Sequence, residues 1–550
     1  MRARERDRVF LRYFSLAHLF NAGVHDAELE TYRAALSKLV NSLSLHPEIN
    51  QLAPIDSTRT IVRLDLRDYN WTAASWNAII AAYPYGVRTV ESRNIEQLSG
   101  AALPYIRGDW FTAHASVPPL YHEILGLPRT ASELERQLGV DVTQDLEEEK
   151  NVARAGLRTS GVSQNNRVLE RHVSAHGAYW KSFDFRNNLD DQNIFRDPLR
   201  LNPAGGEIIF NLPNGLQAYM LINGAGRRID EAPIAIVADR NNTDDPVIRN
   251  GRSCMGCHYA GIQRIKDDVR PVVRGLALAL FDREKALAIY PTQETIDRLI
   301  EKDAIRFQSA AQQAGGLSTS AITEPINALS RRFFADMSVA QAAAEASFEP
   351  KEFRARLARS ERLLSLGYGQ LLVENGGIRR DAWDKHFGAL AQQLQLGEYA
   401  GSIIALPRTG SVSTNSIGET NRSAGINRSA SRSFGTRADP ADILRAARTI
   451  VVRSMTVYLE AELLESELRK RPEFKSLELA IVKDEQMADI RFEINRAEFS
   501  FNYAFTAMNP QTSVIVASGS VIAWNGDFAA PRIAKDFLKQ MQAARDRSQN

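Results

Sequence analysis

The stretch Gly205-Gly-Glu-Ile-Ile-Phe-Asn-Leu-Pro-Asn-Gly-Leu-Gln-Ala-Tyr219 carries the clearest β signal in the chain. Its Asn214-Gly215 pair is a strong hairpin marker, because both central residues of a type I′ turn need positive φ. Apolar residues flank the pair on both sides, so we predict strands over 205–210 and 216–222 and a third over 234–237. The sequence therefore predicts an antiparallel β meander in the middle of the chain.

The predicted meander leads into Asn250-Gly-Arg-Ser-Cys-Met-Gly-Cys-His258, which holds both cysteines of the protein. C-x-x-C-H is the attachment motif of c-type haem. Two thiols three residues apart on one turn can each form a thioether with one porphyrin vinyl group, and the adjacent imidazole can bind the iron. We therefore predict one covalent haem c, with Cys254 and Cys257 as its thioethers and His258 as the proximal iron ligand.

Other interpretations of this motif have weaker support. A thioredoxin-like C-x-x-C would lie within a βαβ pattern, and no such repeated unit surrounds this one. A zinc site needs about four ligands, and with no further cysteine it would have to recruit two distant histidines. Coincidence is the third alternative, and it is improbable for two cysteines and nine histidines in 550 residues.

Composition limits the class of protein. A chain of 550 residues is expected to form two to four domains. Its net charge is +2, from 68 basic and 66 acidic residues, which gives no reason to expect nucleic acid as a partner. No apolar run is long enough for a transmembrane segment in this chain.

Haem is coupled to C-x-x-C-H outside the cytoplasm, so we expect a periplasmic or otherwise exported protein. The basic start of the chain and the interrupted apolar stretch after it do not form a clear export signal. Either that signal lies upstream of this sequence, or the haem interpretation is wrong.

The expected fold class is α+β with several domains. We predict a mainly helical part over 1–200 and the meander, the haem motif and a helical bundle over 201–400. A flexible Gly, Ser, Thr, Asn and Arg-rich linker is expected over 401–440, followed by a small α+β domain over 441–550. The haem region as a whole is thus expected to be mostly helical, with the meander inserted in it.

Local patterns add several expectations. Residues 9–45 are predicted to form a helical hairpin, 62–66 a strand, and 272–289 one helix. Trp71 and Trp76 are expected in the core. The region from about 100 to 200 is predicted to be mostly helical, which would place His172 and His176 on one helical face. That spacing can chelate a metal, although core packing is the stronger interpretation.

The second axial ligand of the iron is harder to predict. In compact cytochromes c it is a methionine some tens of residues after the histidine, and here the first downstream methionine is Met337. Met337 is our candidate distal ligand, although a buried gap-filling role is the more common one for methionine. The same applies to Met220, and Met255 lies inside the motif itself. His176, or no protein ligand at all, is the remaining alternative.

The hairpin stretch, the segment Arg228-Ile-Asp-Glu-Ala-Pro233 and the C-x-x-C-H motif together resemble bacterial cytochrome c domain-containing proteins. These are large exported proteins in which a single C-x-x-C-H follows a β hairpin. The resemblance covers about residues 9–400. It implies covalent haem through Cys254 and Cys257 and proximal ligation by His258, but it implies no particular substrate. The C-terminal domain loosely resembles small periplasmic α+β modules.

Three functions are compatible with these observations. The first is electron transfer by a c-type cytochrome with a redox partner protein that the sequence does not identify. The second is a haem enzyme whose open sixth iron position binds peroxide or another small molecule. The third is a haem-linked sensor or interaction protein, in which the C-terminal domain contacts another protein or the cell envelope. We regard electron transfer as the leading hypothesis and enzymatic activity as uncertain.

Overall fold

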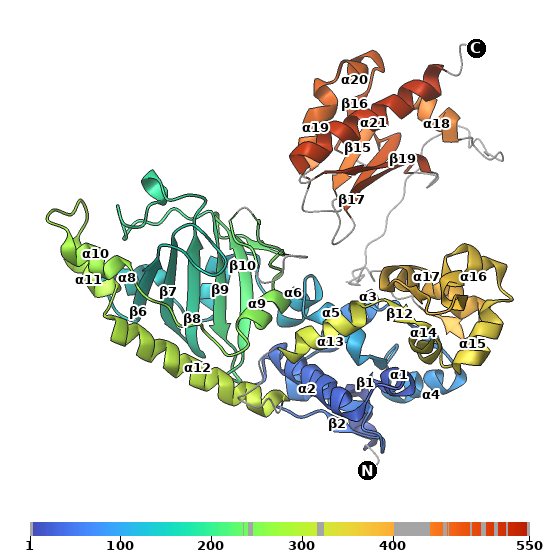
Figure 1. The fold of residues 1–550 in the computed structure, drawn as a ribbon, viewed down its shortest axis with the longest axis horizontal. Coiled ribbons are helices and arrows are strands. Elements are labelled where there is room, and N and C mark those ends of the chain that lie inside the picture. Colours follow the sequence, from blue (N-terminus) through green and yellow to red (C-terminus); the bar gives the residue numbers. More distant parts are fainter. Residues whose placement is uncertain are drawn as a thin grey trace, which may run out of the picture. The chain divides into compact units, whose positions relative to one another are not determined.

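The computed structural model describes residues 4–234, 236–239, 246–315, 324–400, 440–454, 459, 461–483, 487–496, 502–510, 515–523 and 526–546. The chain forms two compact units, Met1–Ser411 and Val412–Asn550 (Figure 1). Both units combine helices with sheets, so the expected α+β class is confirmed. The expected boundary at 200/201 is wrong, since one sheet runs across it. The predicted linker lies outside the described residues, apart from residue 440 at its end.

A six-stranded antiparallel sheet forms one end of the first unit, at the left of Figure 1. The predicted hairpin is confirmed as the β9–β10 pair, with Gly215 at φ +88° in its turn. The third strand is Arg228–Ile229 rather than 234–237, where Ile236 N and Val237 N both bond Pro233 O and fold the chain into a turn. In spatial order the strands are β11 (Arg228–Ile229), β10 (Gln217–Asn223), β9 (Gly205–Asn211), β8 (Gly177–Asp184), β7 (Arg167–Ser174) and β6 (Val152–Leu157).

The prediction of a mostly helical segment over 100–200 is wrong. Its second half supplies β6, β7 and β8, which extend the meander to six strands. His172 therefore lies on β7, and His176 lies in the turn before β8, so they do not share a helical face. A chain segment can complete a sheet whose other strands come later in the sequence, and local helical periodicity does not reveal those partners.

A second sheet of four strands forms near the N-terminus, in the order β2 (Ala53–Pro54), β3 (Ile61–Asp65), β1 (Leu11–Ser15) and β5 (Tyr105–Arg107). The predicted strand over 62–66 corresponds to β3. The first half of the predicted helical hairpin is wrong, because β1 pairs with β3 on one side and β5 on the other. Its second half is confirmed as α2 (Asp26–Ser42). Trp71 and Trp76 are buried in the core, as expected.

Helices surround both sheets of the first unit. The predicted helix over 272–289 is interrupted, and Leu280 in the connecting loop is 87% exposed. Among the described residues, no helix has the length and apolar character needed to cross a membrane. The helices are α1 (Ala17–Asn21), α3 (Ala73–Ala82), α4 (Val90–Ser99), α5 (Gly108–Ala115), α6 (Leu120–Leu125), α7 (Ala131–Gln137), α8 (Val142–Glu148), α9 (Arg252–Cys257), α10 (Val269–Gly275), α11 (Arg283–Ile289), α12 (Gln293–Gly315), α13 (Pro325–Phe334), α14 (Val339–Glu345), α15 (Pro350–Leu357), α16 (Glu361–Ser365) and α17 (Arg380–Gln393). Two short strand pairs complete the unit, β12 (Met337–Ser338) with β13 (Gly377–Ile378), and β4 (Val87–Arg88) with β14 (Glu398–Tyr399).

The second unit is a five-stranded sheet with helices and its own apolar core. The expected small α+β domain is confirmed. Its strands, in spatial order, are β16 (Ala480–Ile481), β15 (Thr449–Ser454), β17 (Ile490–Arg496), β18 (Asn502–Met508) and β19 (Ile515–Ile522). Its helices are α18 (Pro440–Ala446), α19 (Ala461–Lys470), α20 (Pro472–Ser476) and α21 (Gly526–Asp546).

Candidate haem site

The C-x-x-C-H motif forms the short helix α9, and two glycines allow it to pack closely against its neighbours. Gly251 precedes the helix at φ +84°, where a β-carbon would come within 2.5 Å of Ser116 O. A β-carbon on Gly256 would come within 2.4 Å of Nδ2 of Asn327, on α13. The contact at Gly251 is with backbone, so a side chain there would push α9 away from Ser116, whereas at Gly256 the end of the Asn327 side chain would have to shift. Gly251 therefore helps to determine where the two thiols lie.

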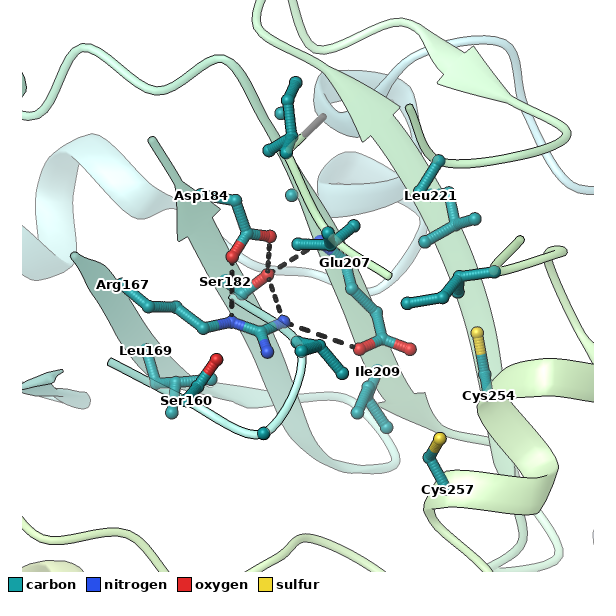
Figure 2. Close-up of a pocket in the computed structure, with 18 of the residues that line it drawn as sticks. Ser160, Arg167, Leu169, Ser182, Asp184, Glu207, Ile209, Leu221, Cys254 and Cys257 are labelled. Atoms are coloured by element: carbon teal, nitrogen blue, oxygen red, sulfur yellow. Dashed lines mark hydrogen bonds and ion pairs between the residues drawn. The ribbon is translucent and has the colours of Figure 1, made fainter. Parts of the chain in front are cut away.

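A cavity of about 300 Å³ lies between α9 and the six-stranded sheet. Cys254, Cys257 and His258 all line it. Figure 2 shows both sulfur atoms on the side of α9 that faces the cavity residues of the sheet, among them Ile209 and Leu221. Much of the remaining lining is aliphatic, from Leu157, Val162, Leu169, Ile222, Ile229, Ile236, Val237, Ile248 and Ile262. An apolar cavity with a few convergent polar groups is the usual form of a cofactor site.

The ring of His258 is held in a defined orientation. Its backbone N donates to Cys254 O at 2.8 Å, which closes the motif's helical turn. Nδ1 lies 3.2 Å from Gly261 O. A carbonyl can only accept, so Nδ1 carries the proton in this hydrogen bond and Nε2 is left to bind a metal. Tyr219 stacks on the ring, with centroids 6.1 Å apart.

One wall of the cavity is polar (Figure 2). The Arg167 guanidinium pairs with Asp184, with Nε 2.9 Å from Oδ1, and its Nη2 lies 3.8 Å from Oε2 of Glu207. Ser182 lies between the two acidic residues: its hydroxyl donates to the Asp184 carboxylate at 3.0 Å and accepts from the backbone N of Glu207 at 2.8 Å. Oε2 of Glu207 is also 3.6 Å from Nε2 of His258. The wall therefore ends in a carboxylate that faces the motif.

Burial and these partners shift the carboxyl pKa values in opposite directions. Burial opposes ionisation of Glu207, but the hydrogen bond and charge of His258, together with the charge of Arg167, lower its pKa to about 2. For Asp184, burial outweighs Arg167 and raises the pKa. Glu207 is therefore the carboxylate that stays ionised at neutral pH beside the motif.

The thiols have the opposite character to those of a redox C-x-x-C. Burial, and then the negative charge of Glu207, raise the pKa of Cys254 well above its usual value and that of Cys257 to about 11. Catalytic thiols of disulfide oxidoreductases need a lowered pKa, since the thiolate is the nucleophile. The raised pKa values are the opposite of what a thioredoxin-like motif needs.

The zinc interpretation is also disfavoured. In the part of the chain that the structure describes, one group of His, Cys, Asp and Glu side chains brings three potential ligand atoms within 4.8 Å of one another, and it consists of His18, Asp109 and Glu345. The motif does not form such a group. In the cluster that does, Arg380 binds Glu345 through two hydrogen bonds of 2.7 and 2.9 Å, and His18 bonds Asp109 at 2.8 Å. We interpret this cluster as a buried ion-pair network.

The candidate second iron ligands lie away from the cavity lining. Met337 is buried on β12, where it pairs with Ile378 of β13. Met220 is buried within β10 and does not line the cavity either. His176, the histidine candidate, lies in the turn before β8 and does not line the cavity. Its neighbour in sequence His172 is bound by Asp145 at 2.7 Å and Glu170 at 3.0 Å, in a network that ties α8 to the sheet. Of the described residues that line the cavity, His258 is the single histidine and none is a methionine.

Sequence reasoning identified the motif but missed the polar wall. Arg167 and Asp184 are far from the motif in sequence and reach it only because β7, β8 and β9 are neighbours in the sheet. Glu207 offered one signal, a charge next to the apolar run 208–210 of a predicted strand. Another lining residue is Trp180, whose Nε1 donates a hydrogen bond to the carboxylate of Asp303 at 2.9 Å. Asp303 lies on the buried face of α12, between Ile300 and Phe307, and a charge at that position was a signal in the sequence.

The residues of this site fit a covalent haem. Two thiols and an imidazole whose Nδ1 is held by Gly261 O line one cavity, and aliphatic side chains from the sheet supply the apolar surface that a porphyrin needs. Comparison of the chain with protein-family models, curated proteins and solved structures found no match.

Proposed function

We propose that this protein is a c-type cytochrome that holds one haem through Cys254 and Cys257 and transfers electrons to or from a partner protein outside the cytoplasm. The observation that carries the proposal is the orientation of His258. Its Nδ1 is fixed by Gly261 O, and the two thiols of the preceding turn line the same apolar cavity. Haem, when bound, supplies an iron that takes up and releases one electron.

The protein's own residues have three tasks in this proposal. Gly251 lets α9 approach Ser116 closely, so that the thiols and the imidazole face one cavity. The aliphatic walls exclude water from most of that cavity, and a low local dielectric strengthens the effect of nearby charges. Tyr219 and Gly261 O keep the imidazole ring in one orientation.

The architecture proposed for the cytochrome region departs from a mostly helical haem domain. The cavity has a sheet on one side and the motif helix on the other, with α13 packed behind the motif. A sheet presents a row of alternate side chains to one flat face, which suits a planar cofactor. We propose the separate α+β unit, Val412–Asn550, as the part that contacts a protein or the envelope.

A haem enzyme is the second candidate, and one observation favours it. The described residues that line the cavity offer no methionine and no second histidine to complete the iron's coordination. An iron left with one strong axial ligand can bind a small molecule such as peroxide. Binding of carbon monoxide to the reduced protein tests this candidate, and a spectrum that carbon monoxide leaves unchanged eliminates it.

The proposed haem attachment is tested with the double variant Cys254→Ala, Cys257→Ala. The full chain is expressed with an export signal and the cytochrome c maturation machinery, and haem is stained on a denaturing gel. We expect a stained band from the wild type and none from the double variant. Tyr259→Phe, one residue after the motif at a side chain that is 40% exposed and does not line the cavity, is the matched control and should keep the band. A wild-type chain without covalent haem under these conditions contradicts the proposal.

A further inference from the structure

We infer that the loop between α10 and α11 inserts into the surface of an anionic membrane, and this inference does not depend on haem. The loop covers residues 276–281, and its sequence Leu-Ala-Leu-Ala-Leu-Phe contains no polar side chain. Connecting segments at a protein surface are usually rich in Gly, Pro, Asn, Asp and Ser. We call the side chains of Leu278 and Leu280 in this loop the leucine tip.

The leucine tip faces water. Leu280 is 87% and Leu278 is 81% exposed, the two highest values for large apolar side chains in the part of the chain that the structure describes. Phe281, at the end of the same loop, instead packs against the core cluster that α10 and α11 form with β7. Figure 1 shows α10 and α11 at the outer edge of the first unit, beyond β6. The loop therefore presents an apolar tip at an edge of this unit.

Hydrogen bonds hold the ends of the loop in one conformation. The Arg283 guanidinium donates to Leu276 O at 3.1 Å through Nη1 and to Arg274 O through Nη2, which joins the start of α11 to the end of α10. Asp282 accepts from the backbone N of Lys285 at 3.0 Å and caps α11. The exposure of the leucine tip is therefore built into the fold, and a preorganised tip loses little conformational entropy when it is buried.

The size and shape of the leucine tip favour a lipid surface over a protein partner. A stable protein–protein interface takes about 800 Å² from each partner, and two leucine side chains on a narrow loop cannot supply that area. A bilayer needs no complementary groove, and apolar side chains that enter its interface bind in proportion to the apolar area they bury. Exposed apolar groups of this kind mark interaction sites, including membrane sites.

The residues beside the leucine tip complement a negatively charged surface. Segment 274–285 contains three cations and two acids, and these are Arg274, Arg283, Lys285, Asp282 and Glu284. Arg274 and Arg283 are both exposed, at the two ends of the loop. Long basic side chains reach the level of the lipid headgroups while neighbouring apolar groups enter the hydrocarbon. The segment therefore combines an apolar tip with an excess of positive charge.

Co-sedimentation of the full-length protein with vesicles of equal parts phosphatidylcholine and phosphatidylglycerol tests this inference. We expect the wild type to bind, and the double variant Leu278→Ser, Leu280→Ser to bind at least about tenfold more weakly, because burial of one leucine is worth about tenfold in an equilibrium constant. Leu98→Ser, which removes a leucine that is 57% exposed on α4, is the matched control and should bind like the wild type. Vesicles of phosphatidylcholine alone should bind the wild type more weakly, since they lack negative headgroups.

A tryptophan at the leucine tip measures insertion directly. The fluorescence of Leu280→Trp should be quenched by vesicles with brominated acyl chains more strongly than that of the wild type, because this quenching needs contact with the hydrocarbon. This variant keeps an apolar side chain at the tip and replaces the double variant if the latter does not fold. Equal quenching in Leu280→Trp and the wild type overturns the inference.

The remaining outcomes also decide the inference. It fails if the wild type does not bind the anionic vesicles, or if it binds neutral vesicles equally well. It fails if the double variant binds like the wild type, since another part of the chain would then make the contact. A wild type that is dimeric by light scattering, with a monomeric double variant, would assign the leucine tip to a second copy of the chain. The loop does not line the haem cavity, so none of these results changes the haem-staining test of the proposed function.

Discussion

Asp303 joins α12 to the sheet that forms the cavity, and its removal should destabilise the first unit strongly. Its carboxylate accepts from Nε and Nη2 of Arg171 at 2.8 and 3.0 Å and from Nε1 of Trp180 at 2.9 Å. Arg171 and Asp303 are 7% and 5% exposed. Asp303→Ala therefore leaves a buried guanidinium without its carboxylate and a buried indole N–H without an acceptor.

The size of the effect follows from these two losses. Breaking a buried ion pair by removing one partner costs about 3–5 kcal/mol, and an orphaned buried donor costs about 1–3 kcal/mol. The losses overlap at one carboxylate, so we expect about 5 kcal/mol in total. An unfolding entropy of about 2.1 cal/mol/K per residue over Met1–Ser411 gives roughly 0.9 kcal/mol/K. The melting temperature of this unit should fall by about 6 °C.

Differential scanning calorimetry of the full chain measures this change. Glu301→Ala, at an exposed position on the same helix, should shift the transition by less than about 1 °C. The double variant Arg171→Leu, Asp303→Leu removes both charges and should be more stable than Asp303→Ala. The reasoning is refuted if Asp303→Ala melts like Glu301→Ala, or if the double variant is less stable than the single one.

Three further predictions address other parts of the first unit. Burial lowers the pKa of His172, but hydrogen bonds and charges from Glu170 and Asp145 outweigh burial and raise it. Protonated His172 therefore stabilises the fold fully below the unfolded pKa of about 6.5. This stabilisation is lost as the pH rises through the higher folded pKa. Thermal melts between pH 6 and 9 should fall more steeply for the wild type than for His172→Gln, and parallel curves would contradict this. Gly251→Ala requires an unfavourable φ of +84° and brings a β-carbon within 2.5 Å of a backbone oxygen. Haem staining per unit of protein should therefore fall severalfold in this variant. Equal staining would show that α9 can shift without cost. Met337→Leu should leave the optical spectrum of the haem-loaded protein unchanged, because Met337 does not line the cavity; loss of a low-spin spectrum would instead identify it as the distal ligand.

Elements whose partners are close in sequence were predictable. The β9–β10 hairpin and α2 follow from a turn dipeptide and from regular apolar spacing within one segment, respectively. Strand β1 was not predictable, because its pairing partners, β3 and β5, begin about 50 and 90 residues later along the chain. The break between α10 and α11 was missed too, since the leucines at 276, 280 and 287 fit an apolar helix face locally.

The sequence alone determined the candidate chemistry, because C-x-x-C-H places two thiols and an imidazole on one turn whatever surrounds it. Only the tertiary structure decided what faces that turn. Strands β7, β8 and β9 bring Arg167, Asp184 and Glu207 beside His258, whereas Met337 is held in a different strand pair. The physical reason is that a motif fixes distances along a few residues, while the charge and dielectric around it depend on side chains that only the folded sheet brings together.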